Sequence, residues 1–182
     1  MENPNKRMIL LLGGARAGKS TYALRLAEEC SHDSSVCFIA TAQPLDEEMS
    51  TRISRHRSER PSHWQTIEEP YDLDEALRHA NDASVVIVDC LTLFVSNWLL
   101  RVNEEQRCEE ILRHICVDFL SVAQERQQTI ICVSNEVGLG IVPETRLGRI
   151  FRDLLGRVNQ DFAQAADEVY FMVAGLKTQL KP

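Results

Sequence analysis

The chain has 182 residues, of which 44% are hydrophobic and 26% are charged, and its formal net charge at pH 7 is −7. These values are typical of one globular domain, here residues 1–182, with a buried core, and they argue against intrinsic disorder. The acidic balance also argues against a nucleic-acid-binding protein, because binding to a phosphate backbone needs a basic face.

The first predicted element is a buried strand, formed by the apolar run 8–12. It leads into a segment that fits the phosphate-loop pattern G-x-x-x-x-G-K-[ST], and helical spacing of apolar residues follows over 21–29. A chance match in a Gly-rich turn is the weaker alternative, because strand, loop and helix come in the required order. We therefore expect the loop to bind a nucleoside triphosphate through Gly13, Gly14, Ala15, Arg16, Ala17, Gly18, Lys19 and Ser20.

The residue types of this loop suit a triphosphate. Glycines let backbone N–H groups point inward at phosphate oxygens, and the N-terminus of the following helix also favours an anion. Lys19 supplies a mobile cation, so we expect it to be catalytic, and Ser20 offers a hydroxyl to Mg²⁺.

Short, nearly continuous apolar runs predict further buried strands, and helical segments separate them. This alternation predicts an α/β, three-layer, phosphate-loop NTPase-like fold with a mostly parallel central sheet flanked by helices. The predicted strands are 36–40, 84–88, 129–133 and 169–173, with a further short strand over 64–67, and the predicted helices are 45–59, 71–81, 91–100, 104–124 and 145–166.

A carboxylate, Asp89, ends the apolar run 85–88. A strand-ending Asp is often only a cap, but phosphate-loop proteins use this arrangement to hold Mg²⁺ beside the loop hydroxyl. Because ligands bind at the carboxyl ends of strands in open α/β sheets, we expect Asp89 and Ser20 to be neighbours and to bind Mg²⁺ together.

A basic cluster over residues 52–60 stands out in this acidic chain. Arg52, His56 and Arg60 follow i, i+4, i+8 spacing and would share one helix face, although Pro61 disfavours helical geometry at Arg60. A solvated basic face is the plain interpretation. The sharper one is chemical: nearby cations disfavour protonation of His56, and a neutral imidazole among phosphate-holding arginines can attack phosphorus. The other histidines, His32, His63, His79 and His114, lack such a setting.

The six cysteines include no C-x-x-C pair and no zinc-like spacing, so we expect free thiols. The N-terminus lacks a secretory apolar region and no run is long enough for membrane insertion, which predicts a cytoplasmic location. Residues 135–143 are an apolar, Gly-containing connection that either covers a substrate, packs on another subunit or is buried. A set of arginines follows, more typical of a solvated or subunit-facing surface than of a substrate clamp: Arg146, Arg149, Arg152 and Arg157.

Several segments together resemble one enzyme family, the bifunctional adenosylcobinamide kinase and adenosylcobinamide-phosphate guanylyltransferase of bacterial cobalamin synthesis. The likeness covers nearly the whole chain, and its specific parts are Arg52-Ile53-x-x-His56, Arg60-Pro61 and Asn135-Glu136-Val137-Gly138. The other matching segments are 13–20, 39–42, 46–49, 89–92, 134–143, 152–160 and 165–169.

The resemblance implies two reactions. A triphosphate, ATP or GTP, phosphorylates the aminopropanol hydroxyl of adenosylcobinamide, and GTP then gives GMP to adenosylcobinamide phosphate through a histidine that maps to His56. It also implies a homotrimer and further nucleotide contacts at Ala40, Thr41, Ala42, Arg57, Ser58, Glu59, Arg60, Glu68 and Asp89.

Two other functions stay open from the residues alone: a kinase without a covalent intermediate, and a non-catalytic GTP-binding switch. The general base of the kinase step is also open, with Glu68 and Glu136 as candidates.

Overall fold

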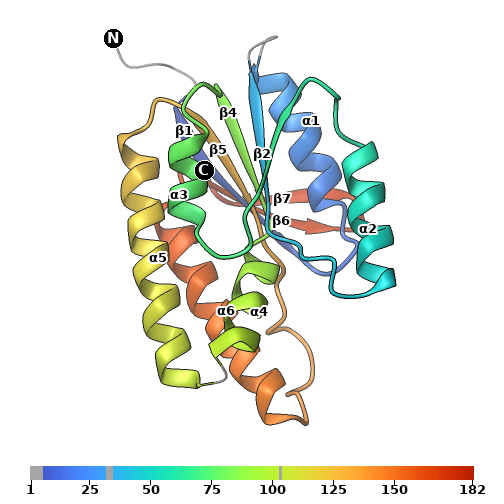
Figure 1. Ribbon diagram of the computed structural model, residues 1–182, viewed down its shortest axis with the longest axis vertical. Coiled ribbons are helices and arrows are strands. Elements are labelled where there is room, and N and C mark those ends of the chain that lie inside the picture. Colours follow the sequence, from blue (N-terminus) through green and yellow to red (C-terminus); the bar gives the residue numbers. More distant parts are fainter. Residues whose placement is uncertain (1–5, 32–34, 103) are drawn as a thin grey trace.

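A central sheet with helices on both faces makes up the computed structural model (Figure 1), which describes residues 6–31, 35–102 and 104–182. His32 and residues 1–5, which the sequence analysis considered, lie outside the described residues. Within them the sheet has seven strands in the order β3-β2-β4-β5-β1-β6-β7. All neighbours pair in parallel except β6 and β7, so the expected mostly parallel α/β fold is confirmed.

The predicted strands all form, including the short one near residue 65. The continuous apolar sequences of β1, β2, β4 and β5 fit strands that are buried on both faces, whereas β3 is a short, partly exposed edge strand. The bounds are β1 (Arg7–Gly13), β2 (Val36–Ala40), β3 (Gln65–Glu68), β4 (Val85–Asp89), β5 (Thr129–Val133), β6 (Glu168–Val173) and β7 (Leu176–Lys181).

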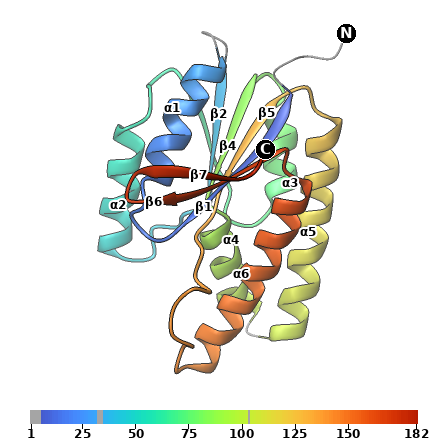
Figure 2. The same cartoon turned by 180° about the vertical axis from the view of Figure 1, so that it is seen from behind.

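The predicted helices also form, and two views show how they are layered (Figures 1 and 2). One apolar core lies between the sheet and α1, and the larger core lies between the opposite face and α3, α4, α5 and α6. The bounds are α1 (Lys19–Ser31), α2 (Glu47–Ser58), α3 (Leu73–His79), α4 (Leu91–Val102), α5 (Glu105–Glu125) and α6 (Arg146–Ala165).

Strand β7 was missed by the sequence analysis. It forms an antiparallel hairpin with β6 through Ala174 and Gly175, whose φ angles of 50° and 80° match the left-handed residues of a tight hairpin turn. Its sequence Leu-Lys-Thr-Gln-Leu-Lys alternates Leu176, Thr178 and Leu180 with Lys177, Gln179 and Lys181, which is a period-2 pattern, and both leucines are exposed. This alternation was the available signal, and it differs from the continuous apolar runs of the inner strands.

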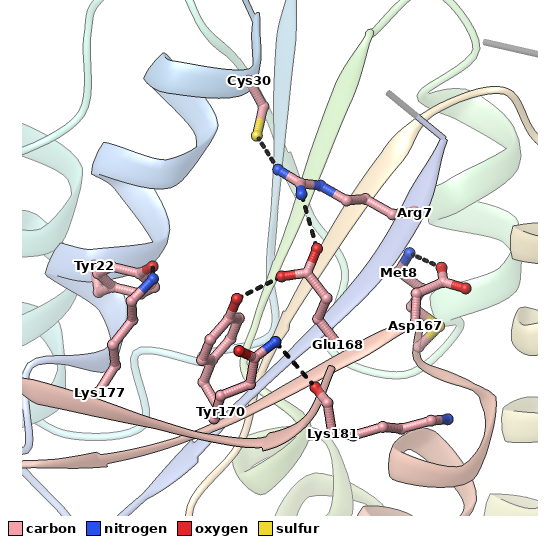
Figure 3. A network of polar contacts seen from close by, with 10 residues as sticks. Arg7, Met8, Tyr22, Cys30, Asp167, Glu168, Tyr170, Lys177 and Lys181 are labelled. Atoms are coloured by element: carbon pink, nitrogen blue, oxygen red, sulfur yellow. Dashed lines mark hydrogen bonds and ion pairs between the residues drawn. The ribbon is translucent and has the colours of Figure 1, made fainter. Parts of the chain in front are cut away.

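A polar network holds this hairpin against β1 and α1 (Figure 3). The Arg7 guanidinium pairs with Glu168 at 2.7 Å and donates to Cys30 Sγ at 3.3 Å. Lys177 donates to the Tyr22 hydroxyl at 2.6 Å, and its ammonium lies 4.7 Å from the Tyr170 ring centroid. The network therefore fixes the strand and the helix that flank the phosphate loop.

All six cysteines are free thiols. Burial raises the pKa of Cys37 and Cys90 to about 11 and that of Cys116 to about 12, so these thiols are inert small apolar groups at neutral pH. Among the described residues, every helix is too short or too polar to cross a bilayer.

Candidate nucleotide-binding site

The predicted phosphate loop connects β1 to α1 at the carboxyl edge of the sheet. Gly13 has φ +147°, and a Cβ atom at this position would lie 2.3 Å from the Met172 carbonyl oxygen. Gly18 has φ +92°, which L side chains rarely adopt. The loop thus needs glycine at these two positions for its backbone path, whereas a Cβ at Gly14 would meet nothing within 4 Å.

Lys19 is buried, with 7% of its surface exposed, and its ammonium folds back on the loop. Its Nζ donates to the carbonyl oxygens of Gly13 at 2.9 Å and Gly14 at 2.7 Å. Burial lowers the pKa of Lys19 and the charge of Arg52 lowers it further, while Cys90 and Asp89 act in the opposite direction. The lysine is thus held by the loop itself, with its charge balanced between an acidic and a basic neighbour.

Neighbouring segments brace the loop backbone. The Gly175 N–H in the β6–β7 turn donates to the Ala17 carbonyl at 3.0 Å, and the Glu136 N–H donates to the Gly13 carbonyl at 3.1 Å. A Cβ at Gly18 would lie 3.2 Å from Gly175 Cα, so the turn packs closely on the loop. The loop is therefore held by tertiary contacts as well as by its own sequence.

Asp89 ends β4 at the same edge of the sheet. It is level with Val133 of β5, and Val133 is level with Leu11 of β1. The Asp89 carboxylate is half-buried and attracts the Lys19 ammonium. With the Ser20 hydroxyl it offers the oxygen ligands that Mg²⁺ prefers, so the donor chemistry of this edge fits the metal that the sequence predicts.

Thr41 connects the end of β2 to the end of β4. Its hydroxyl donates to the Cys90 carbonyl and accepts from the Cys90 N–H, both at 2.8 Å, and its own N–H donates to the Asp89 carbonyl at 3.2 Å. The buried Asn97 amide donates to the Thr41 carbonyl at 2.8 Å and to the Pro70 carbonyl at 3.1 Å. Segments 40–42, 68–70 and 89–90 are thus tied together, and sequence reasoning missed Asn97 because this contact spans 56 residues.

Helix α2 carries His56 beside this edge. The Asp46 carboxylate caps the helix by accepting from the Met49 N–H at 2.7 Å, yet none of the helix residues is buried. The His56 side chain is 29% exposed, and its Nδ1 lies 3.5 Å from a Glu59 carboxylate oxygen. Besides the cations expected around His56, an acidic neighbour from the same segment, Glu59, faces the ring.

The expectation that Arg60 shares the helix face of Arg52 and His56 is wrong, because α2 ends at Ser58. Pro61 disfavours helix at the preceding residue, and the chain turns there. The Arg60 guanidinium instead lies over the Phe38 ring, 3.5 Å from its centroid. Sequence reasoning missed Phe38, since a buried aromatic in a strand gives no signal of its own.

The remaining candidates divide into two groups. Arg57 pairs with Glu68 at 3.5 Å, which brings the end of α2 against the end of β3. In contrast, the Ser58 hydroxyl donates a hydrogen bond to the Arg55 carbonyl of its own helix at 2.8 Å. The Glu136 carboxylate accepts from the Gly138 N–H of its own loop.

Ala40 and Ala42 flank Thr41 at the end of β2, and Gly14, Ala15 and Arg16 form the exposed part of the loop. His79 and His114 lie on exposed helix surfaces, where their partners are Glu75 and Asp118.

Residues 134–145 connect β5 to α6 as an irregular loop. Leu139 is 80% exposed and Ile141 is 98% exposed, so the interpretation as a buried connection is wrong for this chain. The arginines of α6 are engaged within the chain, as in the pairs of Arg146 with Glu105 and of Arg157 with Glu109. These contacts agree with a surface set rather than a substrate clamp.

Comparisons with known proteins agree with this geometry. Two solved structures have a similar fold: the flagellar accessory protein FlaH from Methanocaldococcus jannaschii (TM-score 0.56, 17% identity, covering 97% of this chain and 78% of that one) and a KaiC-like protein from Pyrococcus horikoshii (TM-score 0.50, 16% identity, covering 91% and 70%). At this identity the likeness concerns the fold alone.

Sequence relatives are much closer. The bifunctional adenosylcobalamin biosynthesis protein CobU of Escherichia coli is 42% identical over 96% of this chain and 99% of its own length. The corresponding protein of Salmonella typhimurium is 39% identical over 96% and 99%, and CobP of Pseudomonas aeruginosa is 44% identical over 94% and 96%. A family model for cobinamide kinase / cobinamide phosphate guanyltransferase matches residues 9–180. The chain therefore belongs to the cobinamide kinase / cobinamide phosphate guanyltransferase family.

Proposed function

We propose that this chain phosphorylates adenosylcobinamide with ATP or GTP, and then transfers GMP from GTP through a histidine–GMP intermediate to give adenosyl-GDP-cobinamide. The observation that carries the proposal is the meeting of three elements at one sheet edge. These are the phosphate loop after β1, the end of β4, which is level with β5 and β1, and helix α2, whose Arg57 pairs with Glu68 at the end of β3. Family membership supports the two reaction classes.

In the kinase step, the triphosphate lies in the loop and the substrate hydroxyl attacks its γ-phosphorus. An O–P bond forms, the bond from the γ-phosphorus to the bridging oxygen breaks, the nucleoside diphosphate leaves with the electron pair, and the hydroxyl proton is released to a base or to water. The loop amides and Lys19 neutralise the charge on the transferring group, which is the main task of a protein in phosphoryl transfer. Ser20 and Asp89 would hold Mg²⁺, which when bound supplies further positive charge to the phosphate oxygens. Lys19 exchanges its bonds to the loop carbonyls for phosphate oxygens.

In the transferase step, a ring nitrogen of His56 attacks the α-phosphorus of GTP. An N–P bond forms and the bond from phosphorus to the bridging oxygen breaks, so pyrophosphate leaves with its electron pair. An oxygen of adenosylcobinamide phosphate then attacks the same phosphorus and displaces His56. The Glu59 carboxylate, 3.5 Å from Nδ1, favours the tautomer with its proton on Nδ1 and leaves Nε2 free to attack.

The corrin substrate and the assembly belong to the same proposal. Leu139, Ile141 and Val142 form an exposed apolar loop. We propose that this loop either covers the bound corrin or contacts another subunit of the homotrimer. The free, buried thiols are typical of a reducing compartment and support a cytoplasmic enzyme.

Replacing His56 separates the two activities. We expect His56→Ala to abolish guanylyl transfer while leaving phosphorylation of adenosylcobinamide within about threefold of wild type, since the nucleophile serves only the second step. The exposed His63 lies in the same segment, and His63→Ala is the matched control that should retain both activities. Equal loss of both activities in a folded His56→Ala protein would contradict the proposed roles.

A further inference from the structure

Arg60 is a half-buried cation whose guanidinium is supported by an aromatic ring. Its Cζ lies 3.5 Å from the centroid of the Phe38 ring, and Phe38 is only 3% exposed in β2. The Nε atom of Arg60 is buried and has no hydrogen-bond partner. The position of this side chain thus depends on the ring beneath it.

The charge of Arg60 is poorly compensated within the chain. Burial lowers the pKa of Arg60, whereas Asp89, Glu68 and Glu59 raise it from a distance. Within the described residues, none of these carboxylates comes into ion-pair range of the Arg60 guanidinium. Glu68 pairs with Arg57 instead, and Glu59 lies beside Arg55 and His56 of the preceding helix. A desolvated cation without a counter-charge is costly, and an anionic ligand would remove that cost.

The stacked arrangement suits phosphate recognition. With one face of the guanidinium on the ring, its N–H groups remain directed outward in the plane, and this planar fork matches two phosphate oxygens. Phe38 is level with Ile87 of β4, two residues before Asp89, and it shares an apolar cluster with Ala17 of the phosphate loop, so the stacked guanidinium lies on the face of the sheet that carries the loop.

We propose that Phe38 is a positioning residue, which holds the Arg60 guanidinium by a cation–π contact so that it binds a phosphate of GTP. This inference rests on the proposed transferase reaction, and it assigns the aromatic face of Phe38 a role beyond filling the core. A leucine would fill much of the same space but offers no π-face, whereas a tyrosine keeps the ring.

The test is a double-mutant cycle on the full-length protein. We expect Phe38→Leu to raise the dissociation constant of GTP, measured by calorimetry, and its KM in GMP-adduct formation, both by about 3- to 30-fold. Phe38→Tyr, which keeps the ring, should leave the dissociation constant and KM of GTP at their wild-type values. In an Arg60→Ala background, Phe38→Leu should cause no further change, because the ring acts only through the guanidinium.

Two further measurements separate positioning from packing. Phe119→Leu makes the same change at a fully buried ring that stacks on Phe162 in the opposite core, and it should leave GTP binding unchanged. Trifluorinated phenylalanine at position 38 keeps the size of the ring but weakens its negative face, so it should weaken GTP binding in the same direction as Phe38→Leu.

The inference is overturned if Phe38→Leu weakens GTP binding equally with and without Arg60, or if the fluorinated ring binds GTP as well as the natural one. A wild-type protein that binds GTP but never forms the adduct would instead refute the transferase reaction, and the binding cycle would still decide the role of Phe38.

Discussion

The two regions that frame the candidate site are built very differently. Helix α1, which follows the phosphate loop, buries six residues including Lys19 and Tyr22, whereas none of the residues of α2 is buried. The phosphate loop is held by backbone contacts from Gly175 and Glu136. Helix α2 depends on its Asp46 cap and on exposed side-chain pairs such as Arg57 with Glu68.

This difference matches the different demands of the two proposed reactions. In the proposed mechanism the backbone N–H groups of a loop with a fixed path meet the triphosphate charge without rearrangement, which favours electrostatic stabilisation of the transition state. The histidine lies on a helix with few tertiary contacts, which is typical of segments that adjust to a ligand. The shared step is thus assigned to the rigid region and the specialised step to the lightly anchored one.

The largest effect is expected at the rigid region. Lys19→Ala should lower kcat of both the kinase and the transferase reaction by about 10²- to 10³-fold, because one charge-stabilising donor is lost from both transition states. Steady-state assays of each reaction measure this. A Lys19→Ala protein that loses only one activity would show that the two triphosphates do not share the loop.

The backbone path of the loop gives the next effect. Gly13→Ala should lower the free energy of unfolding by about 2–4 kcal/mol, because the new Cβ meets the Met172 carbonyl at a strained φ angle. Gly14→Ala is the matched control, since its Cβ has open space, and it should stay within about 0.5 kcal/mol of wild type. Urea unfolding compares the two variants, and equal stabilities would contradict the rigid-loop account.

The same contrast explains what the sequence could predict. Inner strands such as 36–40 and 129–133 were predicted at their observed bounds because they are continuous apolar runs. The phosphate loop was predictable because its chemistry is local. Strand β7 was missed because an exposed edge strand carries polar residues at alternate positions.

Contacts between distant segments were beyond sequence reasoning. The bond of Asn97 to Thr41 and the stack of Arg60 on Phe38 are made by folding, and neither pair has a local signature. The i, i+8 spacing placed Arg60 on a helix face, but the chain had already left the helix. The exposure of Ile141 depends equally on the tertiary fold, because the same apolar sequence would also fit a buried connection.

The buried ammonium of Lys19 also predicts a pH effect on stability. Because burial lowers the pKa of Lys19 below its ordinary value of 10.5, the unfolded chain binds more protons between the two values, and stability contributed by this group rises with pH across that window. Lys19→Met should therefore be the more stable protein at pH 7 in urea unfolding, with the gap closing toward pH 10.5. If the free energies of unfolding of the wild type and of Lys19→Met changed with pH in the same way, this account would be contradicted.

The smallest effect is expected at α2. Asp46→Ala removes the helix cap and should weaken hydrogen-exchange protection in α2 by about 0.5–1 kcal/mol. Global unfolding should hardly change, since none of the residues of the helix is fully buried. Asp46→Asn keeps the acceptor and serves as the control. A large drop in the unfolding temperature with Asp46→Ala would mean that α2 is integrated into the core.

The central claim is that His56 becomes covalently bound to GMP. The direct measurement is to incubate the purified protein with GTP labelled at the α-phosphorus, quench in alkali, and locate the label by peptide mapping. The account predicts an acid-labile label on the peptide that contains His56, and no label in His56→Ala. A protein that completes guanylyl transfer without this label, or that carries it on another residue, would contradict the account.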